Sequence, residues 1–260
     1  MTLLSIINPA YAVSGFVVGG LVGMTGVGGG SLMTPLLVLL FGIHPSTAVG
    51  TDLLYASITK TGGTLVHGMN KTVDWRVTGR LAAGSLPAAI ATVLLLHRFG
   101  APPNSALISI TLGLALILTA VSVVFRPLIV KFAARLGELG PNKVTVLTVL
   151  TGVALGVLVT ISSVGAGALG VTALILLYPK LPTARIVGSD IAHAVPLTLV
   201  AGLGHLWLGS VNGVLLASLL VGSIPGVMIG SHFSARVPDK VLRPILAVAL
   251  LLVGGRLFFP

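Results

Sequence analysis

Gly23-Met-Thr-Gly26-Val-Gly28-Gly29-Gly30-Ser31 is the first of two glycine-rich stretches that interrupt the apolar sequence of this chain. The second is Thr160-Ile-Ser162-Ser163-Val-Gly165-Ala-Gly167, and each leads into an apolar run of 13 residues, at 31–43 and at 166–178. As a helix, such a run reaches only about 20 Å of the roughly 30 Å thickness of a bilayer core. Irregular backbone at membrane depth is tolerated only where protein or a watery cavity satisfies its polar groups. The two stretches therefore predict broken helices inside a membrane protein.

The composition agrees with this interpretation. Of 260 residues, 55% are hydrophobic and 8% are charged, and the mean hydropathy is +1.11, whereas a soluble domain carries about 25% charged residues. At about 20 residues per span, the length allows about eight to ten crossings and leaves no room for a soluble catalytic or nucleic-acid-binding domain. The apolar runs lie at 10–25, 31–43, 46–67, 77–97, 104–125, 144–161, 166–178, 184–206, 212–233 and 241–259. They predict an all-α, polytopic transmembrane helix bundle, in which we expect the first run to be retained as a span.

The two halves of the chain repeat each other. An offset of 137 superposes Gly28, Gly30 and Pro45 on Gly165, Gly167 and Pro182. One inserted residue then changes the offset to 138, which places Gly50-Thr51-Asp52 on Gly188-Ser189-Asp190, His67 on His205, and Gly84-Ser85-Leu86-Pro87 on Gly222-Ser223-Ile224-Pro225. Aligned Asp, His and Pro are hard to obtain by chance in apolar sequence. We therefore divide the chain into a first repeat at 1–125, a basic connecting loop at 126–143 and a second repeat at 144–260.

The basic residues indicate that the repeats are inverted. The net charge of +10 and the pI of about 11.0 come from Lys and Arg in short loops between apolar runs. This distribution follows the positive-inside rule and does not indicate a nucleic-acid partner. If the loops richer in Lys and Arg are cytoplasmic, the run 46–67 crosses the membrane from outside to inside. Its counterpart 184–206 crosses from inside to outside. The loop at 126–143 is then cytoplasmic and the halves are inverted. Each repeat is expected to begin with a glycine-broken helix pair or a hairpin.

The glycine-rich stretches are candidates for anion binding. A helix that begins inside the membrane presents free backbone N–H groups and the positive end of its dipole. Inverted repeats with broken helices are typical of secondary transporters, whose substrate sites lie near the midplane. Alternatively, glycines serve close helix packing, as the spacings Gly15-x3-Gly19 and Gly222-x3-Gly226 suggest. The candidate substrate-binding residues are Gly26, Gly28, Gly29, Gly30, Ser31, Thr51, Ser162, Ser163, Gly165, Gly167 and Ser189.

Four ionisable side chains are candidates for coupling or for organising the site: Asp52, Lys60, Asp190 and His193. A charge at membrane depth costs about 2.5–3.5 kcal/mol on insertion scales, so each is a functional candidate. The carboxylates could instead complement helix dipoles, and Lys60 could pair with Asp52 or meet an anionic substrate. His193 follows Asp190 by one turn, where the two could form a proton-passing pair, or it is an ordinary packed histidine. The chain has no cysteine and no His-x3-His spacing, so neither a metal nor another cofactor is expected.

These residues resemble a known family. The cluster from Gly26 to Ser31, Pro35 and the segment Pro45-x2-Ala48-x-Gly50-Thr51-Asp52, with their second-half echoes, look like the sulfite exporter TauE/SafE family of membrane permeases. The resemblance covers nearly the whole chain. It implies a multi-pass transporter of the cell inner membrane for small, often sulfur-containing anions, such as sulfite, organosulfonates, thiosulfate or sulfide. The second repeat departs from the glycine-rich form at Ser162 and Ser163.

We interpret the chain as a secondary transporter and not an enzyme. It would move a small anion by alternating access of the two repeats, with protons as a candidate second substrate. One alternative is a passive anion channel, because a pair of broken helices can also line a pore. Another is an intramembrane hydrolase, for which Ser31, Ser162, Ser163 and His193 would supply a nucleophile and a base. No Gly-x-Ser-x-Gly elbow supports the hydrolase.

Overall fold

The computed structural model describes residues 7–25, 30–99, 105–135 and 140–233, together with residues 247–248, 250–252 and 254–256 near the C-terminus. Nine helices are defined within these residues, and no strand occurs among them. They are α1 (Pro9–Thr25), α2 (Gly30–Phe41), α3 (Pro45–Met69), α4 (Trp75–Arg98), α5 (Ser105–Ala133), α6 (Pro141–Ser162), α7 (Ala168–Leu177), α8 (Thr183–Trp207) and α9 (Gly213–Phe233). The prediction of an all-α bundle is confirmed.

Five described helices are long and apolar enough to cross a membrane, namely Trp75–Arg98, Ile108–Ala133, Pro141–Ser162, Thr183–Trp207 and Gly213–Gly230. α3 has 25 residues but also carries the charged side chains Asp52 and Lys60. α2 has 12 residues and α7 has 10, so they extend only about 18 Å and 15 Å. The two short apolar runs after the glycine-rich stretches therefore form short helices.

Local sequence signals explain where several helices begin. α3 starts at Pro45 and α6 at Pro141, where the missing N–H of proline removes no hydrogen bond from the helix. Asp74 caps α4, because its Oδ1 accepts hydrogen bonds from the backbone N–H groups of Arg76 at 3.0 Å and Val77 at 3.3 Å. Such signals act over a few residues. For this reason these three helices begin close to the starts of the predicted apolar runs.

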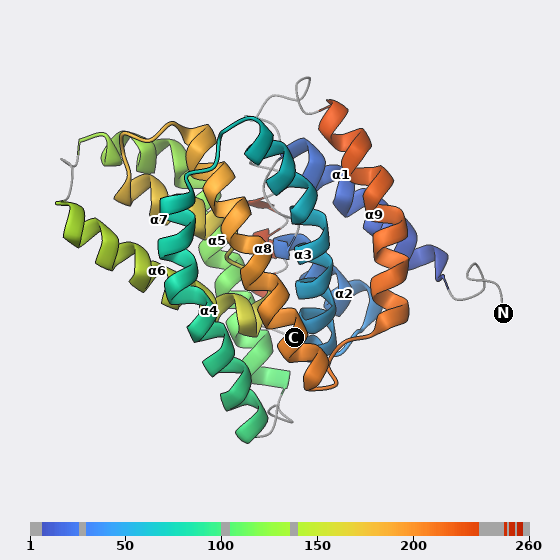
Figure 1. Cartoon of the computed structure of the whole chain (residues 1–260). Coiled ribbons are helices and arrows are strands. Elements are labelled where there is room, and N and C mark those ends of the chain that lie inside the picture. The colour runs from blue at the N-terminus through green and yellow to red at the C-terminus, as the bar shows by residue number, and fades with distance from the viewer. Residues whose placement is uncertain are drawn as a thin grey trace.

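Three helix pairs form most of the bundle (Figure 1). α1 packs along α9, α4 packs along α6, and α3 packs along α8 between these outer pairs. Glycines bring the backbones of the outer pairs together. A Cβ atom on Gly15 would overlap the carbonyl oxygen of Leu219, and one on Gly152 would overlap that of Leu81. The packing role considered for the spaced glycines of α1 and α9 is thus confirmed.

Equivalent residues of the two halves make equivalent contacts with the opposite half. The contact of Gly15 with α9 and that of Gly152 with α4 are related by the offsets of the sequence repeat. The central helices run antiparallel, because Gly50 near the start of α3 faces His205 near the end of α8, and Gly188 near the start of α8 faces His67 near the end of α3. Equivalent helices thus point in opposite directions. Their orientation in the membrane stays a prediction.

The connection between the halves is shorter than the predicted loop at 126–143. α5 continues to Ala133 and α6 begins at Pro141. Ala133 is buried in a cluster with Val77 and Leu81 of α4, and this packing extends the helix beyond its most apolar part. The division into repeats at 1–125 and 144–260 stays a prediction.

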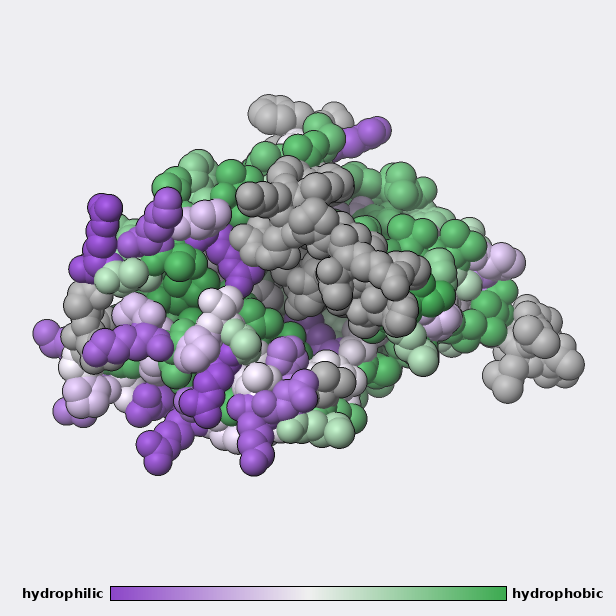
Figure 2. Space-filling view, turned by 90° about the horizontal axis from the view of Figure 1, so that it is seen from above, coloured by the Kyte–Doolittle hydropathy of each residue, from purple (hydrophilic) through white to green (hydrophobic). Residues whose placement is uncertain are grey.

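Hydrophilic side chains gather on the end of the molecule that Figure 2 shows from above. Exposed basic residues lie where α3 and α5 end and where α4, α6 and α8 begin: Lys71, Arg76, Lys131, Arg135, Lys143, Lys180 and Arg185. Trp75 is exposed at the start of α4 and Trp207 is exposed at the opposite end, where α8 finishes. Since tryptophan is enriched at membrane–water interfaces, the two side chains are suited to mark the two interface levels.

Candidate functional site

Two buried carboxylates lie on the central helices. Asp52 of α3 and Asp190 of α8 are both 0% exposed and occupy equivalent positions in the sequence repeat. Each is the eighth residue of its helix, about 10 Å along the axis from the start. Because the helices are antiparallel, these distances are measured from opposite ends of the bundle. A buried carboxylate is costly unless its surroundings compensate it, so its neighbours are informative.

Two hydroxyl groups hold the carboxylate of Asp52. Its Oδ2 accepts one hydrogen bond from Oγ1 of Thr34 in α2 and another, at 3.0 Å, from Oγ of Ser163 at the end of α6. Its Oδ1 has no hydrogen-bond partner among the described residues. Asp52 therefore joins the short helix of the first half to the helix break of the second half.

Asp190 is compensated differently. Within the described part of the chain, neither of its carboxylate oxygens has a hydrogen-bond partner. The carboxylate lies against Gly170, where a Cβ atom would overlap Oδ1, and it attracts the backbone amide of Gly167 without the geometry of a hydrogen bond. Gly167 is the N-cap residue of α7 and, as a glycine, has no side chain to cap that helix. The negative charge of Asp190 thus faces the positive end of a short helix, which favours the role in complementing a helix dipole.

Lys60 lies between the carboxylates and the helix break. Its side chain is buried, and Nζ donates a hydrogen bond of 3.0 Å to the carbonyl oxygen of Ala166, between α6 and α7. The ammonium group is attracted by both carboxylates. The hydrogen bond considered between Lys60 and Asp52 is replaced by this bond to a backbone carbonyl, because Asp52 lies two turns away on the same helix. An ammonium group has three donors, so Lys60 retains capacity to bind an anion.

The break between α6 and α7 has the backbone that its sequence predicts. Ser163 adopts a left-handed conformation with φ of 59°, and Gly165 and Gly167 have φ of 127° and 129°, values that side chains other than hydrogen rarely allow. Oγ of Ser162 accepts a hydrogen bond of 3.2 Å from the backbone N–H of Val164. Ser162, Gly165 and Gly167 therefore shape the turn, while Ser163 contacts Asp52.

The first glycine-rich stretch is described only in part. Gly26, Gly28 and Gly29 lie outside the described residues. Gly30 and Ser31 are the first two residues of α2. Gly30 is the counterpart of Gly167, so the short helices of the two halves begin at equivalent places.

Thr51 and Ser189 hold connecting segments. Oγ1 of Thr51 accepts a hydrogen bond of 3.1 Å from the backbone N–H of Asn212, and Oγ of Ser189 accepts one of 2.8 Å from the backbone N–H of Asp74. These two bonds are equivalent under the offset of 138. They fix the segments between α8 and α9 and between α3 and α4. The described hydrogen bonds do not bring either hydroxyl to Lys60 or to a buried carboxylate.

His193 turns away from Asp190. Its Nε2 and Oγ of Ser85 in α4 lie 2.7 Å apart, and its Nδ1 has no partner among the described residues. The equivalent contact in the other half is the 2.9 Å hydrogen bond from the hydroxyl of Tyr55 to Oγ of Ser223. The hydrogen-bonded pair considered for Asp190 and His193 is thus not formed in the structure. His193 packs instead as a buried histidine that links α8 to α4.

Sequence reasoning missed three parts of this site: Thr34, the carbonyl group of Ala166, and Gly170. None of them carries a signal, because the repeat places Val171 opposite Thr34 and Met33 opposite Gly170. Ser85 and Ser223 were detectable, since they align within a four-residue motif of the repeat. A serine matched in both halves could have been predicted to contact the central helices.

Comparison with known proteins identifies a family over nearly the whole chain. The family described as Sulfite exporter TauE/SafE matches residues 11–257. This range contains both glycine-rich stretches, both buried aspartates and Lys60. No solved structure matches the chain.

Several relatives match most of the chain. "Probable membrane transporter protein YjnA" of Bacillus subtilis is 44% identical over 248 residues, which are 94% of this chain and 96% of that protein. "Probable membrane transporter protein YdhB" of the same organism is 29% identical over 248 residues, 94% of this chain and 97% of that protein. "Probable membrane transporter protein MJ0441" of Methanocaldococcus jannaschii is 29% identical over 200 residues, 75% of this chain and 70% of that protein. All three names describe a membrane transporter, and none states a substrate.

Proposed function

The chain belongs to the sulfite exporter TauE/SafE family, and from this premise we propose that it is a secondary transporter of a small sulfur-containing oxyanion, such as sulfite or an organosulfonate. The family, the names of the relatives and the five membrane-length helices indicate a multi-pass membrane transporter. The class of substrate and the mechanism are our proposal. We place the protein in the cell inner membrane, as the resemblance implies.

The observation that carries the proposal is a buried lysine beside a helix break. Lys60 is the one buried Lys or Arg side chain among the described residues. It contacts the turn from which α7 starts, so an ammonium group and a helix N-terminus lie close together. Both attract an oxyanion, the first through its charge and the second through free backbone N–H groups. An anion bound there would contact Lys60 and the first residues of α7.

The charges around Lys60 suggest how the anion is coupled to a proton. Two buried carboxylates and one buried lysine give one more negative than positive charge when all three are ionised. A substrate anion adds a further negative charge in surroundings that screen charges poorly. A proton on one carboxylate removes the excess. We expect Asp190 to take this proton, because none of the described residues forms a hydrogen bond with its carboxylate and its charge competes with the substrate for the N-terminus of α7.

Equivalent residues of the two halves make equivalent contacts with the opposite half, and this symmetry supports alternating access. α3 and α8 are equivalent and antiparallel, and they carry the two aspartates from opposite ends. Rocking of one repeat against the other could then expose a central site to either side in turn. The proposed orientation is testable with reporters. A reporter fused after Arg135 should lie in the cytoplasm, and one inserted at 208–212 should lie outside. Both on one side would overturn the inverted topology.

Transport assays in liposomes test the proposed function. Benzenesulfonate is a suitable probe because it stays charged and does not cross lipid as a neutral acid. We expect saturable uptake, acceleration by unlabelled sulfonate or sulfite on the opposite side, and accumulation against a gradient when a pH difference is imposed. If chloride on the opposite side accelerated uptake of benzenesulfonate and neither sulfonate nor sulfite did so, the proposed class of sulfur-containing oxyanions would be contradicted.

The same assay separates the transporter from the two alternatives. A passive channel would pass current and show no acceleration by substrate on the opposite side, and that result would replace our proposal. Among the described residues, His193 contacts Ser85, whereas Ser162 and Ser163, two of the nucleophiles considered for the hydrolase, bond to Leu158 and Asp52. The described geometry therefore does not pair His193 with either of these two serines. A base must lie within hydrogen-bond reach of its nucleophile.

A further inference from the structure

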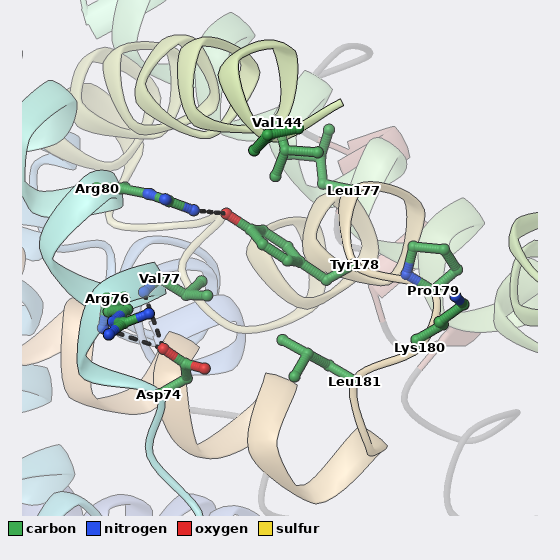
Figure 3. Close-up of a pocket in the computed structure, with 11 residues that line it drawn as sticks. Asp74, Arg76, Val77, Arg80, Val144, Leu177, Tyr178, Pro179, Lys180 and Leu181 are labelled. Carbon is green, nitrogen blue, oxygen red and sulfur yellow. Dashed lines mark hydrogen bonds between the residues drawn. The ribbon is translucent and has the colours of Figure 1, made fainter. Parts of the chain in front are cut away.

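A second polar region of the molecule is a cavity of about 470 Å³ at the basic end of the bundle. Its walls come from the start of α4, the start of α6 and the segment that joins α7 to α8 (Figure 3). Arg76, Arg80, Lys180 and Asp74 contribute its charged side chains. The lining includes neither buried aspartate nor Lys60, so the cavity is separate from the proposed transport site.

The lining of the cavity favours an anion. Three cationic side chains and one carboxylate belong to the described lining of the cavity. That carboxylate, of Asp74, already accepts hydrogen bonds from the backbone at the start of α4, and its charge is offset there by the helix dipole. Among the described residues, the lining therefore carries more positive than negative charge.

Arg80 is held in position at the cavity wall. Its Nη1 donates a hydrogen bond of 3.2 Å to the hydroxyl of Tyr178, and that hydroxyl lies 2.8 Å from Oγ1 of Thr148 in α6. Figure 3 shows the guanidinium group pointing across the cavity toward Tyr178. A guanidinium group has five N–H donors in a planar fork that matches phosphate oxygens. A pre-positioned arginine of this kind loses little side-chain freedom when it binds an anion.

The remaining lining is apolar. Val144, Leu177 and Leu181 form part of the wall. Their side chains have no charge and no hydrogen-bond donor with which to bind a small hydrated ion. The exposed Trp75 lies in sequence between the lining residues Asp74 and Arg76, and tryptophan is typical of the interface between water and lipid. The ligand that matches both parts of the wall has an anionic head next to apolar carbon.

We propose that this cavity binds the phosphate group of an anionic phospholipid such as phosphatidylglycerol. Arg76 and Arg80 contact the phosphate, and the apolar wall contacts the glycerol and the first acyl carbons. Basic pockets between transmembrane helices are suited to such headgroups, and each basic residue contributes about fivefold in affinity. A bound lipid would bridge α4, α6 and the segment after α7.

Quenching of tryptophan fluorescence by brominated lipids tests the proposal. The chain has two tryptophans, so Trp207→Phe leaves Trp75 beside the cavity and Trp75→Phe leaves Trp207 at the opposite end. In phosphatidylcholine vesicles, a small fraction of brominated phosphatidylglycerol should quench Trp75 saturably and more strongly than brominated phosphatidylcholine does. Arg76→Gln and Arg80→Gln should each reduce this preference about fivefold. Arg98→Gln, an exposed arginine at the other end of α4, is the matched control and should keep the preference.

Each other outcome overturns the proposal. Equal quenching of Trp75 by the two lipids, or an unchanged preference in both arginine variants, means that the cavity does not select anionic lipid. An equal preference at Trp207 means that anionic lipid surrounds the whole protein without a site. If inorganic phosphate or sulfate stabilises the protein against heat through Arg80 and the lipid preference is absent, the cavity binds a free oxyanion instead. Benzenesulfonate uptake by the arginine variants verifies that they are folded.

Discussion

Asp52 and Asp190 occupy equivalent positions on equivalent helices, and both are fully buried. Asp52 accepts hydrogen bonds from two hydroxyl groups, one from each half of the chain. Asp190 accepts none from the described residues and faces the start of α7 across Gly170. Equivalent positions in the two halves therefore have different environments. The carboxylate of Asp52 is held by hydrogen bonds, and that of Asp190 has none from the described residues.

A few side chains cause this difference. The repeat places Val171 where the first half has Thr34, so this hydroxyl donor to Asp52 has no counterpart in the second half. It places Gly170 where the first half has Met33, which lets the carboxylate approach the backbone of α7. The shared backbone thus fixes where the carboxylates lie, and their neighbours decide what each can do. On our proposal, Asp52 organises the broken helices and Asp190 carries the proton.

The largest expected effect on proton coupling comes from Asp190→Asn. A pH difference of about one unit supplies about 1.4 kcal/mol per proton, which corresponds to about tenfold accumulation of a coupled anion. The variant should lose this accumulation and retain exchange of substrate across the membrane, because it cannot carry the proton. Asp52→Asn should retain accumulation, since an amide oxygen can still accept both hydroxyl bonds. Loss of coupling in Asp52→Asn but not in Asp190→Asn would reverse the assignment.

Lys60→Met tests the positive charge between the two carboxylates. We expect affinity for benzenesulfonate to fall about 100-fold, because loss of one partner of a buried charged contact costs about 3 kcal/mol. Thr198 occupies the equivalent position in the second half, and its hydroxyl donates to the carbonyl groups of Ala194 and Val195 in its own helix. Thr198→Val is therefore the control and should bind normally. Substrate affinity is measured by concentration-dependent uptake, and an unchanged value in Lys60→Met would remove the basis of the proposed anion site.

A reciprocal exchange of hydroxyl groups sharpens the comparison. Thr34→Val removes one donor from Asp52 and should lower the free energy of unfolding by about 1–3 kcal/mol, as unpaired buried polar groups do. Val171→Thr places a hydroxyl at the position equivalent to Thr34. We expect it to donate to Asp190, to stabilise the ionised carboxylate and to slow proton-driven uptake by up to about tenfold at neutral pH. Chemical denaturation and initial uptake rates measure the two effects. Identical behaviour of the two variants would mean that the environments are not distinct.

The smallest effect is expected at the hydrogen bond between Tyr55 and Ser223, whose counterpart in the other half is the contact between His193 and Ser85. Tyr55→Phe removes a hydrogen bond to Ser223 and should lower stability by about 1 kcal/mol without changing transport. The double variant Tyr55→Phe with Ser223→Ala should cost little more than Tyr55→Phe alone, because both changes remove the same bond. Loss of proton coupling in Tyr55→Phe would show that this contact is part of the transport site.

Much of the fold followed from local sequence. The helix class, the short helices α2 and α7, and the break at Ser163 to Gly167 were predictable, because apolar run length and glycine act over a few residues. The continuation of α5 to Ala133 was not predictable, because it depends on packing against Val77 and Leu81. In the candidate site, Asp52, Lys60 and Asp190 could be named because charged residues are rare in apolar helices.

The sequence by itself determined which residues are equivalent, since the repeat aligns Asp52 with Asp190 and leaves Lys60 opposite Thr198. Only the tertiary structure decided their partners. Lys60 contacts Ala166, a residue 106 positions away, and His193 contacts Ser85 in preference to its neighbour Asp190. A hydrogen bond depends on distances of about 3 Å between atoms. Those distances are set when helices from both halves pack together, and no spacing along one helix contains them.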